Sequence, residues 1–140
     1  MVGLVVVTHS AKVAEGVADT AAQMGGEGRV VPAGGDPDGG LGTDVDRIEA
    51  AIRESYEANV DADAESEADG VVVLVDLGSA VMSAETAADV VEVDGIEVAF
   101  ADAPVVEGTV EAAVEATSPK ATLDSVVERA EGAREYRKFG

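Results

Sequence analysis

The 140-residue chain contains no cysteine, no tryptophan and a single histidine, and aromatic residues make up only 3% of it. Without cysteine, disulfide bonds, thiolate chemistry and cysteine-bound zinc are excluded. With so few aromatic side chains, the core must be built from valine, alanine, leucine and isoleucine. The hydrophobic content of 46% favours a folded protein over a disordered one. The length fits one domain, and we expect residues 1–140 to form it.

Basic residues are also scarce, with 9 lysines and arginines against 29 aspartates and glutamates, for a net charge of −20. The acids are spread over most of the chain, unlike an acidic tail, and periodic apolar residues argue against a disordered acidic segment. We favour a halophilic surface, on which high salt screens the repulsion between like charges. The domain is then expected to unfold in low salt. The charge argues against nucleic acid or an anionic membrane as a partner.

Long apolar segments are absent too. No apolar run approaches the roughly 18 residues that a transmembrane helix needs. The N-terminus has no basic region followed by a cleavable apolar segment. We therefore expect a cytoplasmic protein that does not enter the membrane.

Short apolar runs alternate with longer amphipathic ones along the chain. The apolar run at residues 2–7, broken only by Gly3, and the continuous run at residues 71–75 predict strands buried on both faces of a parallel sheet. Residues 29–32 and 96–101 predict two weaker strands. Apolar residues at helical spacing predict five helices, which begin near residues 11, 45, 81, 106 and 123.

This order predicts an α/β fold: a single doubly wound domain with a mainly parallel four-stranded sheet of order 2-1-3-4 and helices on both faces. In this order the first and third strands are neighbours. Because their connections leave in opposite directions, a crevice opens at their carboxyl ends, where such folds bind ligands.

Three local signals predict how segments begin and end. Thr43, with Asp46 three residues later, resembles a capping box for the second helix. Ser118 before Pro119 predicts a capped start for the last helix. Residues 59–70 are rich in acids and predict a surface loop.

His9 ends the first predicted strand and Asp76 follows the third, so both are expected at the crevice within hydrogen-bonding reach. A carboxylate on one ring nitrogen would fix the tautomer and leave the other nitrogen as a base or nucleophile. The helix start after Ser10 and the one near Gly78 and Ser79 offer backbone N–H groups that suit an anion, such as a phosphoryl group on His9.

Other interpretations of these residues are open. A histidine after a strand is often only a turn or capping residue, and an aspartate there is ordinary turn chemistry. The glycine-rich stretch 33–43 lacks the spacing and the lysine of a nucleotide-binding P-loop. A surface loop is the preferred interpretation, although Gly42 and Thr43 are candidates for the rim of the crevice. One histidine among scattered carboxylates gives no metal-ligand spacing, so no metal is expected.

Four blocks of sequence together resemble a known family: GLVVVTHSAKVAEGV, GTD, VLVDLGSAVMSAETA and APVVEGTVEAAV. They are similar to the phosphotransferase subunit of the phosphoenolpyruvate-dependent dihydroxyacetone kinase, the DhaM type. That subunit itself resembles the enzyme IIA domain of the mannose-class sugar phosphotransferase system. The similarity runs in order from residue 2 to about residue 114, and the DLGSAVMSAETA block is its most specific part.

The resemblance implies a cytoplasmic homodimeric phosphocarrier without a cofactor. His9 would accept a phosphoryl group from the phosphocarrier protein HPr, on Nε2, while Asp76 holds Nδ1. The group would then pass to ADP bound to the kinase subunit DhaL, which works in complex with DhaK, the subunit that binds dihydroxyacetone. Two alternatives remain. One is an enzyme IIA domain that feeds a mannose-class sugar permease, and the other is a non-catalytic regulatory binding domain in which His9 is structural.

Overall fold

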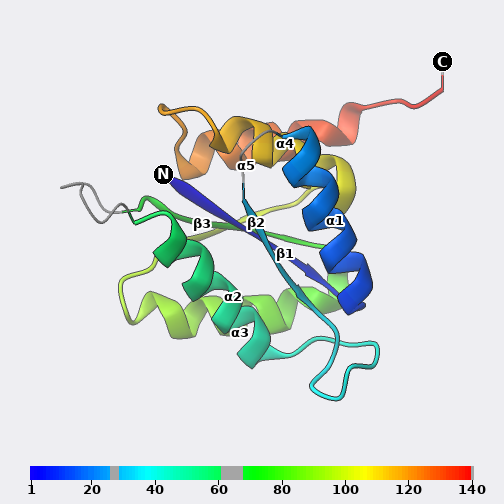
Figure 1. The fold of residues 1–140 in the computed structure, drawn as a ribbon, viewed down its shortest axis with the longest axis vertical. Coiled ribbons are helices and arrows are strands. Elements are labelled where there is room, and N and C mark those ends of the chain that lie inside the picture. The colour runs from blue at the N-terminus through cyan, green and yellow to red at the C-terminus, as the bar shows by residue number, and fades with distance from the viewer. Residues whose placement is uncertain (26–28, 61–67, 140) are drawn as a thin grey trace.

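The fold is built on four parallel strands in the part of the chain that the computed structural model describes, residues 1–25, 29–60 and 68–139. The strands are hydrogen-bonded in the order β2-β1-β3-β4, which confirms the predicted order 2-1-3-4 (Figure 1). Strand β1 therefore lies directly beside β3. The strands are β1 (Val2–Thr8), β2 (Val30–Gly34), β3 (Gly70–Val75) and β4 (Val98–Ala101).

Helices cover both faces of this sheet, as the sequence predicted (Figure 1). Helices α1, α4 and α5 pack on one face, and α2 and α3 pack on the other. The layers are thus helix, sheet and helix, the arrangement of a doubly wound α/β domain. The helices are α1 (Ala11–Met24), α2 (Val45–Ala58), α3 (Val81–Glu92), α4 (Val105–Ala116) and α5 (Leu123–Glu131).

Alternate residues of β1 point into two separate cores. Leu4 and Val6 pack with residues of α1, α4 and α5, whereas Val5 and Val7 pack with residues of α2 and α3. All four side chains are buried. Because helices cover both faces, the strand needs no polar alternation and its sequence is a continuous apolar run. Packing on both sides fixes the strand, and with it the residue that follows.

The β2 edge of the sheet is protected by a proline. The N–H of Gly35 donates to the carbonyl of Thr8 at 3.2 Å, so the backbone of Gly35 faces β1. Backbone groups alternate along a strand, which means that Pro32 faces outward from the sheet. Proline has no N–H to offer there, and prolines in sheets are confined to such edge positions. This edge therefore presents an incomplete template for a further strand.

The start of α2 differs from the prediction. Its N-cap is Asp44, whose carboxylate accepts a hydrogen bond from the N–H of Asp46 at 3.2 Å. The hydroxyl of Thr43 lies instead 2.8 Å from the hydroxyl of Ser83 on α3. The predicted capping box is wrong because a partner distant in sequence binds the threonine, and the next residue caps the helix.

The start of α5 differs as well. Ser118 and Pro119 lie in the connection after α4, and the helix begins at Leu123. Thr122 and Ser125 form its capping box, with the Ser125 N–H donating to the Thr122 hydroxyl at 3.0 Å. Leu123 is buried in the core that α5 shares with α1 and α4. The helix begins where its apolar side reaches that core, so the earlier serine and proline were a misleading local signal.

The acidic side chains of the described residues lie at the surface. Among these residues the buried polar side chains are Thr8, Ser55 and Thr109, and none that carries a charge is buried. Most of the acidic loop predicted over residues 59–70 falls at positions 61–67, which lie outside the described residues. The salt dependence of folding stays a prediction. None of the helices in the described ranges is both long enough and apolar enough to span a membrane.

Candidate functional site at the carboxyl ends of β1 and β3

His9 and Asp76 leave neighbouring strands at the same edge of the sheet. Val7 of β1 is paired with Val75 of β3, so the residues that follow these strands emerge side by side. The N–H of Asp76 donates to the carbonyl of Val7 at 3.0 Å, which extends the ladder by one bond. The adjacency of β1 and β3 thus brings two residues 67 positions apart into one site.

The Asp76 carboxylate holds both the ring and the backbone of His9. Nδ1 of His9 lies 3.0 Å from Oδ1 of Asp76, and the backbone N–H of His9 donates to Oδ2 at 3.0 Å. The N–H of Leu77 donates to Oδ1 at 2.8 Å. The side chains of His9 and Asp76 are 23% and 16% exposed. An ionised carboxylate only accepts hydrogen bonds, so a neutral His9 carries its proton on Nδ1 and leaves a lone pair on Nε2.

Ser79 occupies the other side of the imidazole. Its hydroxyl oxygen lies 2.8 Å from Nε2 of His9. With the proton on Nδ1, Nε2 is an acceptor and the serine hydroxyl donates to it. Ser79 lies in the short 3-10 turn Gly78–Ala80, which leads into α3. The first N–H groups of such a turn have no acceptor within it, so Gly78 and Ser79 offer donors beside the ring.

Ser10 has a different place from Ser79. It is the N-cap of α1, and its hydroxyl accepts a hydrogen bond from the N–H of Val13 at 3.4 Å. Its carbonyl accepts the hydroxyl of the buried Thr8 at 2.5 Å. Ser10 therefore shapes the turn that carries His9 and starts the helix after it, whereas the ring itself is held by Asp76 and Ser79.

The C-terminal end of the glycine-rich stretch 33–43 borders the candidate site. The N–H of Gly42 donates to the carbonyl of His9 at 2.9 Å. The hydroxyl of the next residue, Thr43, lies 2.8 Å from that of Ser83, and this bond ties the loop to α3. Gly42 and Thr43 thus support the backbone around the histidine from a third segment of the chain. Ser83 lies in the DLGSAVMSAETA block, but it was not among the candidate site residues from the sequence.

Gly34 is a further residue that the sequence did not single out. A Cβ atom at this position would lie 2.6 Å from the Ser10 carbonyl oxygen and 2.9 Å from both the Ala11 Cα and the Thr8 hydroxyl oxygen. These separations are shorter than van der Waals contact, and two of the three atoms belong to backbone. The end of β2 therefore approaches the turn after His9 so closely that only glycine fits.

Gly34→Ala is expected to destabilise the domain by about 1–3 kcal/mol, the usual range for overpacking. The new methyl group must displace the Ser10–Ala11 backbone, so the imidazole resonances of His9 should shift as well. Gly16→Ala is the matched control, because nothing lies within 4 Å of its Cβ position. That change in a helix should stabilise by about 0.5–1 kcal/mol. Denaturant unfolding measures the stability of each variant, and NMR measures the shift of the His9 imidazole resonances. Equal stability of Gly34→Ala and the parent would contradict the close approach.

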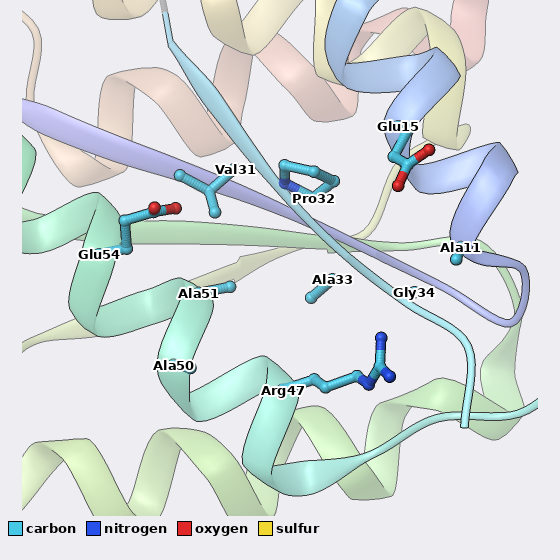
Figure 2. A pocket seen from close by; sticks show the side chains of 10 residues that line it. All are labelled: Ala11, Glu15, Val31, Pro32, Ala33, Gly34, Arg47, Ala50, Ala51 and Glu54. Carbon is cyan, nitrogen blue, oxygen red and sulfur yellow. The ribbon is translucent and has the colours of Figure 1, made fainter. Parts of the chain in front are cut away.

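A separate hollow of about 320 Å³ lies over the β2 edge between α1 and α2 (Figure 2). Its charged lining residues are Glu15, Arg47 and Glu54. Neither His9 nor Asp76 lines it, so it is distinct from the candidate site. Across the described ranges, no group of three or more histidine, aspartate or glutamate side chains is arranged to hold a metal ion. The expectation of no metal stays a prediction.

The fold is a doubly wound α/β domain with His9 and Asp76 at the switch point of its sheet. The EIIA-man family, described as PTS system fructose IIA component, matches residues 3–127. That range includes every strand from β2 to β4 and both segments that form the candidate site. The chain belongs to this family.

Curated relatives are all of one kind, the phosphoryl donor subunit DhaM of a PEP-dependent dihydroxyacetone kinase. The subunit from Pantoea ananatis is 41% identical over 133 residues, 91% of this chain and 26% of the relative. The DhaM subunit of PEP-dependent dihydroxyacetone kinase 1 from Listeria innocua is 38% identical over 106 residues, 76% of this chain and 74% of the relative. The chain belongs with these DhaM-type subunits. It spans about a quarter of the length of the Pantoea relative.

Solved structures share the fold. A crystal structure of EF1359, a protein of unknown function, has a TM-score of 0.77 and 29% identity, covering 99% of this chain and 98% of its own. The phosphotransferase system component EIIA from Streptococcus agalactiae has a TM-score of 0.63 and 14% identity. The match covers 95% of this chain and 92% of the EIIA component. At 14% identity, the similarity to the Streptococcus agalactiae component shows a shared fold and no more.

Proposed function

We propose that this protein is a phosphohistidine carrier in which Nε2 of His9 accepts and then donates a phosphoryl group. The observation that carries the proposal is the pair of contacts on the ring: Oδ1 of Asp76 lies 3.0 Å from Nδ1, and the Ser79 hydroxyl lies 2.8 Å from Nε2. A neutral imidazole held in this way has its nucleophilic lone pair at one defined atom. Membership of the EIIA-man family supports the same chemistry.

The phosphoryl transfer to His9 needs no additional acid or base. The lone pair of Nε2 attacks the phosphorus carried by a histidine of HPr, the donor P–N bond breaks, and its electrons return to the donor ring. The proton on Nδ1 of His9 stays in place, and the positive charge that forms on the ring faces the Asp76 carboxylate. Asp76 is thus a positioning residue that also stabilises the phosphorylated ring.

The phosphoryl group on Nε2 needs hydrogen-bond donors, since the chain carries a net charge of −20. Ser79 already contacts Nε2 and must turn its hydroxyl toward the phosphoryl oxygens. The N–H groups of Gly78 and Ser79, at the start of the turn before α3, supply further donors. The helix that starts after Ser10 adds the positive end of its dipole.

We further propose that the acceptor is ADP held by a kinase subunit of the DhaL type, acting with DhaK to phosphorylate dihydroxyacetone. A β-phosphate oxygen of ADP attacks the phosphorus, the Nε2–P bond breaks, and its electrons return to the ring of His9. The DhaM-type relatives support this acceptor. The second candidate is a sugar permease of the phosphotransferase system, favoured by the fructose description of the family. A cytoplasmic homodimer is part of the proposal.

Incubation with phosphoenolpyruvate, enzyme I and HPr should add one phosphoryl group, about 80 Da, to the intact protein. The modified peptide should contain His9, and the label should be lost in acid but retained in base, as expected for phosphohistidine rather than phosphoserine. Leaving out HPr is the control. Absence of the added mass, or its location on a peptide without His9, would contradict the proposal.

The acceptor is tested with the phosphorylated protein. Addition of DhaL with ADP should discharge the label and form ATP, whereas membranes that carry a mannose-class permease should leave it in place. The reverse result would favour the sugar permease over the dihydroxyacetone kinase.

A further inference from the structure

The hollow over the β2 edge is open because the side chains around it are small. Strand β2 is the outermost strand of the described sheet, so no further strand fills the space between α1 and α2. The volume of about 320 Å³ and a largely apolar lining with a few polar groups are typical of a site for a small molecule. Four alanines contribute to that lining: Ala11, Ala33, Ala50 and Ala51 (Figure 2).

Two opposite charges line this hollow without pairing with each other. Glu15 extends from α1 and Arg47 from α2, on opposite sides of β2 (Figure 2). The carboxylate nearest to Arg47 is that of Asp44, at 3.7 Å, whereas a charge-assisted hydrogen bond measures about 2.7–2.9 Å. Among the described residues, no ion pair joins Glu15 to a basic side chain. The guanidinium and the carboxylate are therefore both accessible to a ligand.

The edge of β2 adds a backbone donor and a backbone acceptor. Because the backbone of Gly35 faces β1, the alternation along the strand turns the backbone of Gly34 and Pro32 outward. Both residues line the hollow. The N–H of Gly34 and the carbonyl of Pro32 thus face the side on which a ligand enters, with no neighbouring strand in the described sheet to bind them.

We propose that this hollow binds a small apolar α-amino acid as its zwitterion, with the carboxylate at Arg47 and the ammonium group at Glu15. The N–H of Gly34 donates to the ligand carboxylate, and the carbonyl of Pro32 accepts from the ammonium group. The inference goes beyond the proposed phosphocarrier function and does not depend on it.

The charge of the protein favours a ligand without net charge. A net charge of −20 repels an anion at long range, and Arg47 repels a simple cation inside the hollow. A zwitterion avoids both penalties and provides a partner for each of the two charged side chains. An apolar ligand side chain then lies against Val31 and the alanines of α2, where burial of apolar surface adds to the affinity.

The hollow shares a wall with the turn that carries His9. Ala11 lines it two positions after the histidine. Gly34 approaches this turn so closely that a Cβ atom there would lie 2.6 Å from the Ser10 carbonyl oxygen. A bound amino acid therefore contacts the backbone that supports the imidazole, and its binding is expected to shift the His9 resonances.

The test uses L-valine as the probe, titrated into the full chain and followed by calorimetry and ¹H–¹⁵N NMR. Saturable binding is expected, with shifts of the Gly34 amide and of the His9 imidazole. Isobutylamine and isovalerate keep the valine side chain, but one lacks the carboxylate and the other the ammonium group. Each is expected to bind at least roughly tenfold more weakly than valine, because one charge-assisted contact is lost.

Variants assign the two charges. Glu15→Gln and Arg47→Gln are each expected to raise the Kd for valine roughly tenfold. Asp19→Asn is the matched control, because this carboxylate is exposed on the same helix as Glu15 and does not line the hollow. Ala50→Leu should abolish binding by filling the space, and leucine is a strong helix former at this exposed position of α2. Circular dichroism of each variant checks the fold.

The outcomes separate this site from the phosphocarrier function. Absence of saturable valine binding overturns the proposal, and so does equal binding of isovalerate or isobutylamine. An unchanged Kd in Glu15→Gln and Arg47→Gln, or an equal loss in Asp19→Asn, overturns it as well. Valine binding that leaves the His9 imidazole resonances unshifted would overturn the contact with the histidine turn. No phosphoryl donor enters these measurements, so their failure leaves the proposed function standing, and the reverse also holds.

Discussion

A His9→Gln variant is expected to take up no phosphoryl group, with HPr or with phosphoramidate as the donor. The glutamine amide has no lone pair of comparable nucleophilicity, and the chain has no second histidine to replace it. We expect the loss to reach the detection limit, because the nucleophile itself is removed. Intact-mass measurement after incubation with each donor is the direct assay.

The fold of this variant should persist, since His9 is partly exposed and its backbone bonds to Asp76 and Gly42 do not depend on the ring. Circular dichroism and denaturant unfolding provide the control. Residual uptake at the parental rate would mean that another residue, such as Ser79, carries the phosphoryl group. That result would remove His9 from its proposed role.

Asp76→Asn is expected to slow phosphoryl uptake by up to roughly ten-thousandfold, by analogy with other carboxylates that hold a histidine in one tautomer. In the parent, each carboxylate oxygen of Asp76 accepts one backbone N–H, from His9 and from Leu77. An asparagine must turn its NH₂ group toward one of these donors, whichever way the amide is oriented. When that group faces the ring, it donates to Nδ1 and moves the imidazole proton to Nε2, the atom that must attack.

Single-turnover phosphorylation by HPr measures this effect, and ¹⁵N NMR of the imidazole reports the tautomer independently. Asp76→Ala should fold and also transfer slowly, because it removes the acceptor for Nδ1. Ser79→Ala is the milder comparison, since the N–H groups of the turn remain. A parental rate in both Asp76 variants would place Asp76 outside the transfer site.

The sequence by itself predicted the arrangement of the sheet and the pairing of the two candidate site residues, His9 and Asp76. Near-continuous apolar runs occur where helices cover both faces of a parallel strand, and this short-range pattern needs no tertiary information. The alternation of strands and helices predicted a doubly wound parallel sheet, and β2-β1-β3-β4 is a common strand order of such sheets. That order alone brought His9 beside Asp76, because the carboxyl ends of adjacent parallel strands lie at one edge.

Only the tertiary structure decided what surrounds the pair. The contact between Ser79 and Nε2, the bond from Thr43 to Ser83 and the close approach of Gly34 to the turn after His9 all join segments distant in sequence. Such contacts depend on the paths of loops, whose backbones have no repeating period. For the same reason the local capping signal at Thr43 failed: a hydroxyl binds the partner that the fold brings near, and neighbouring residues in the sequence do not specify that partner.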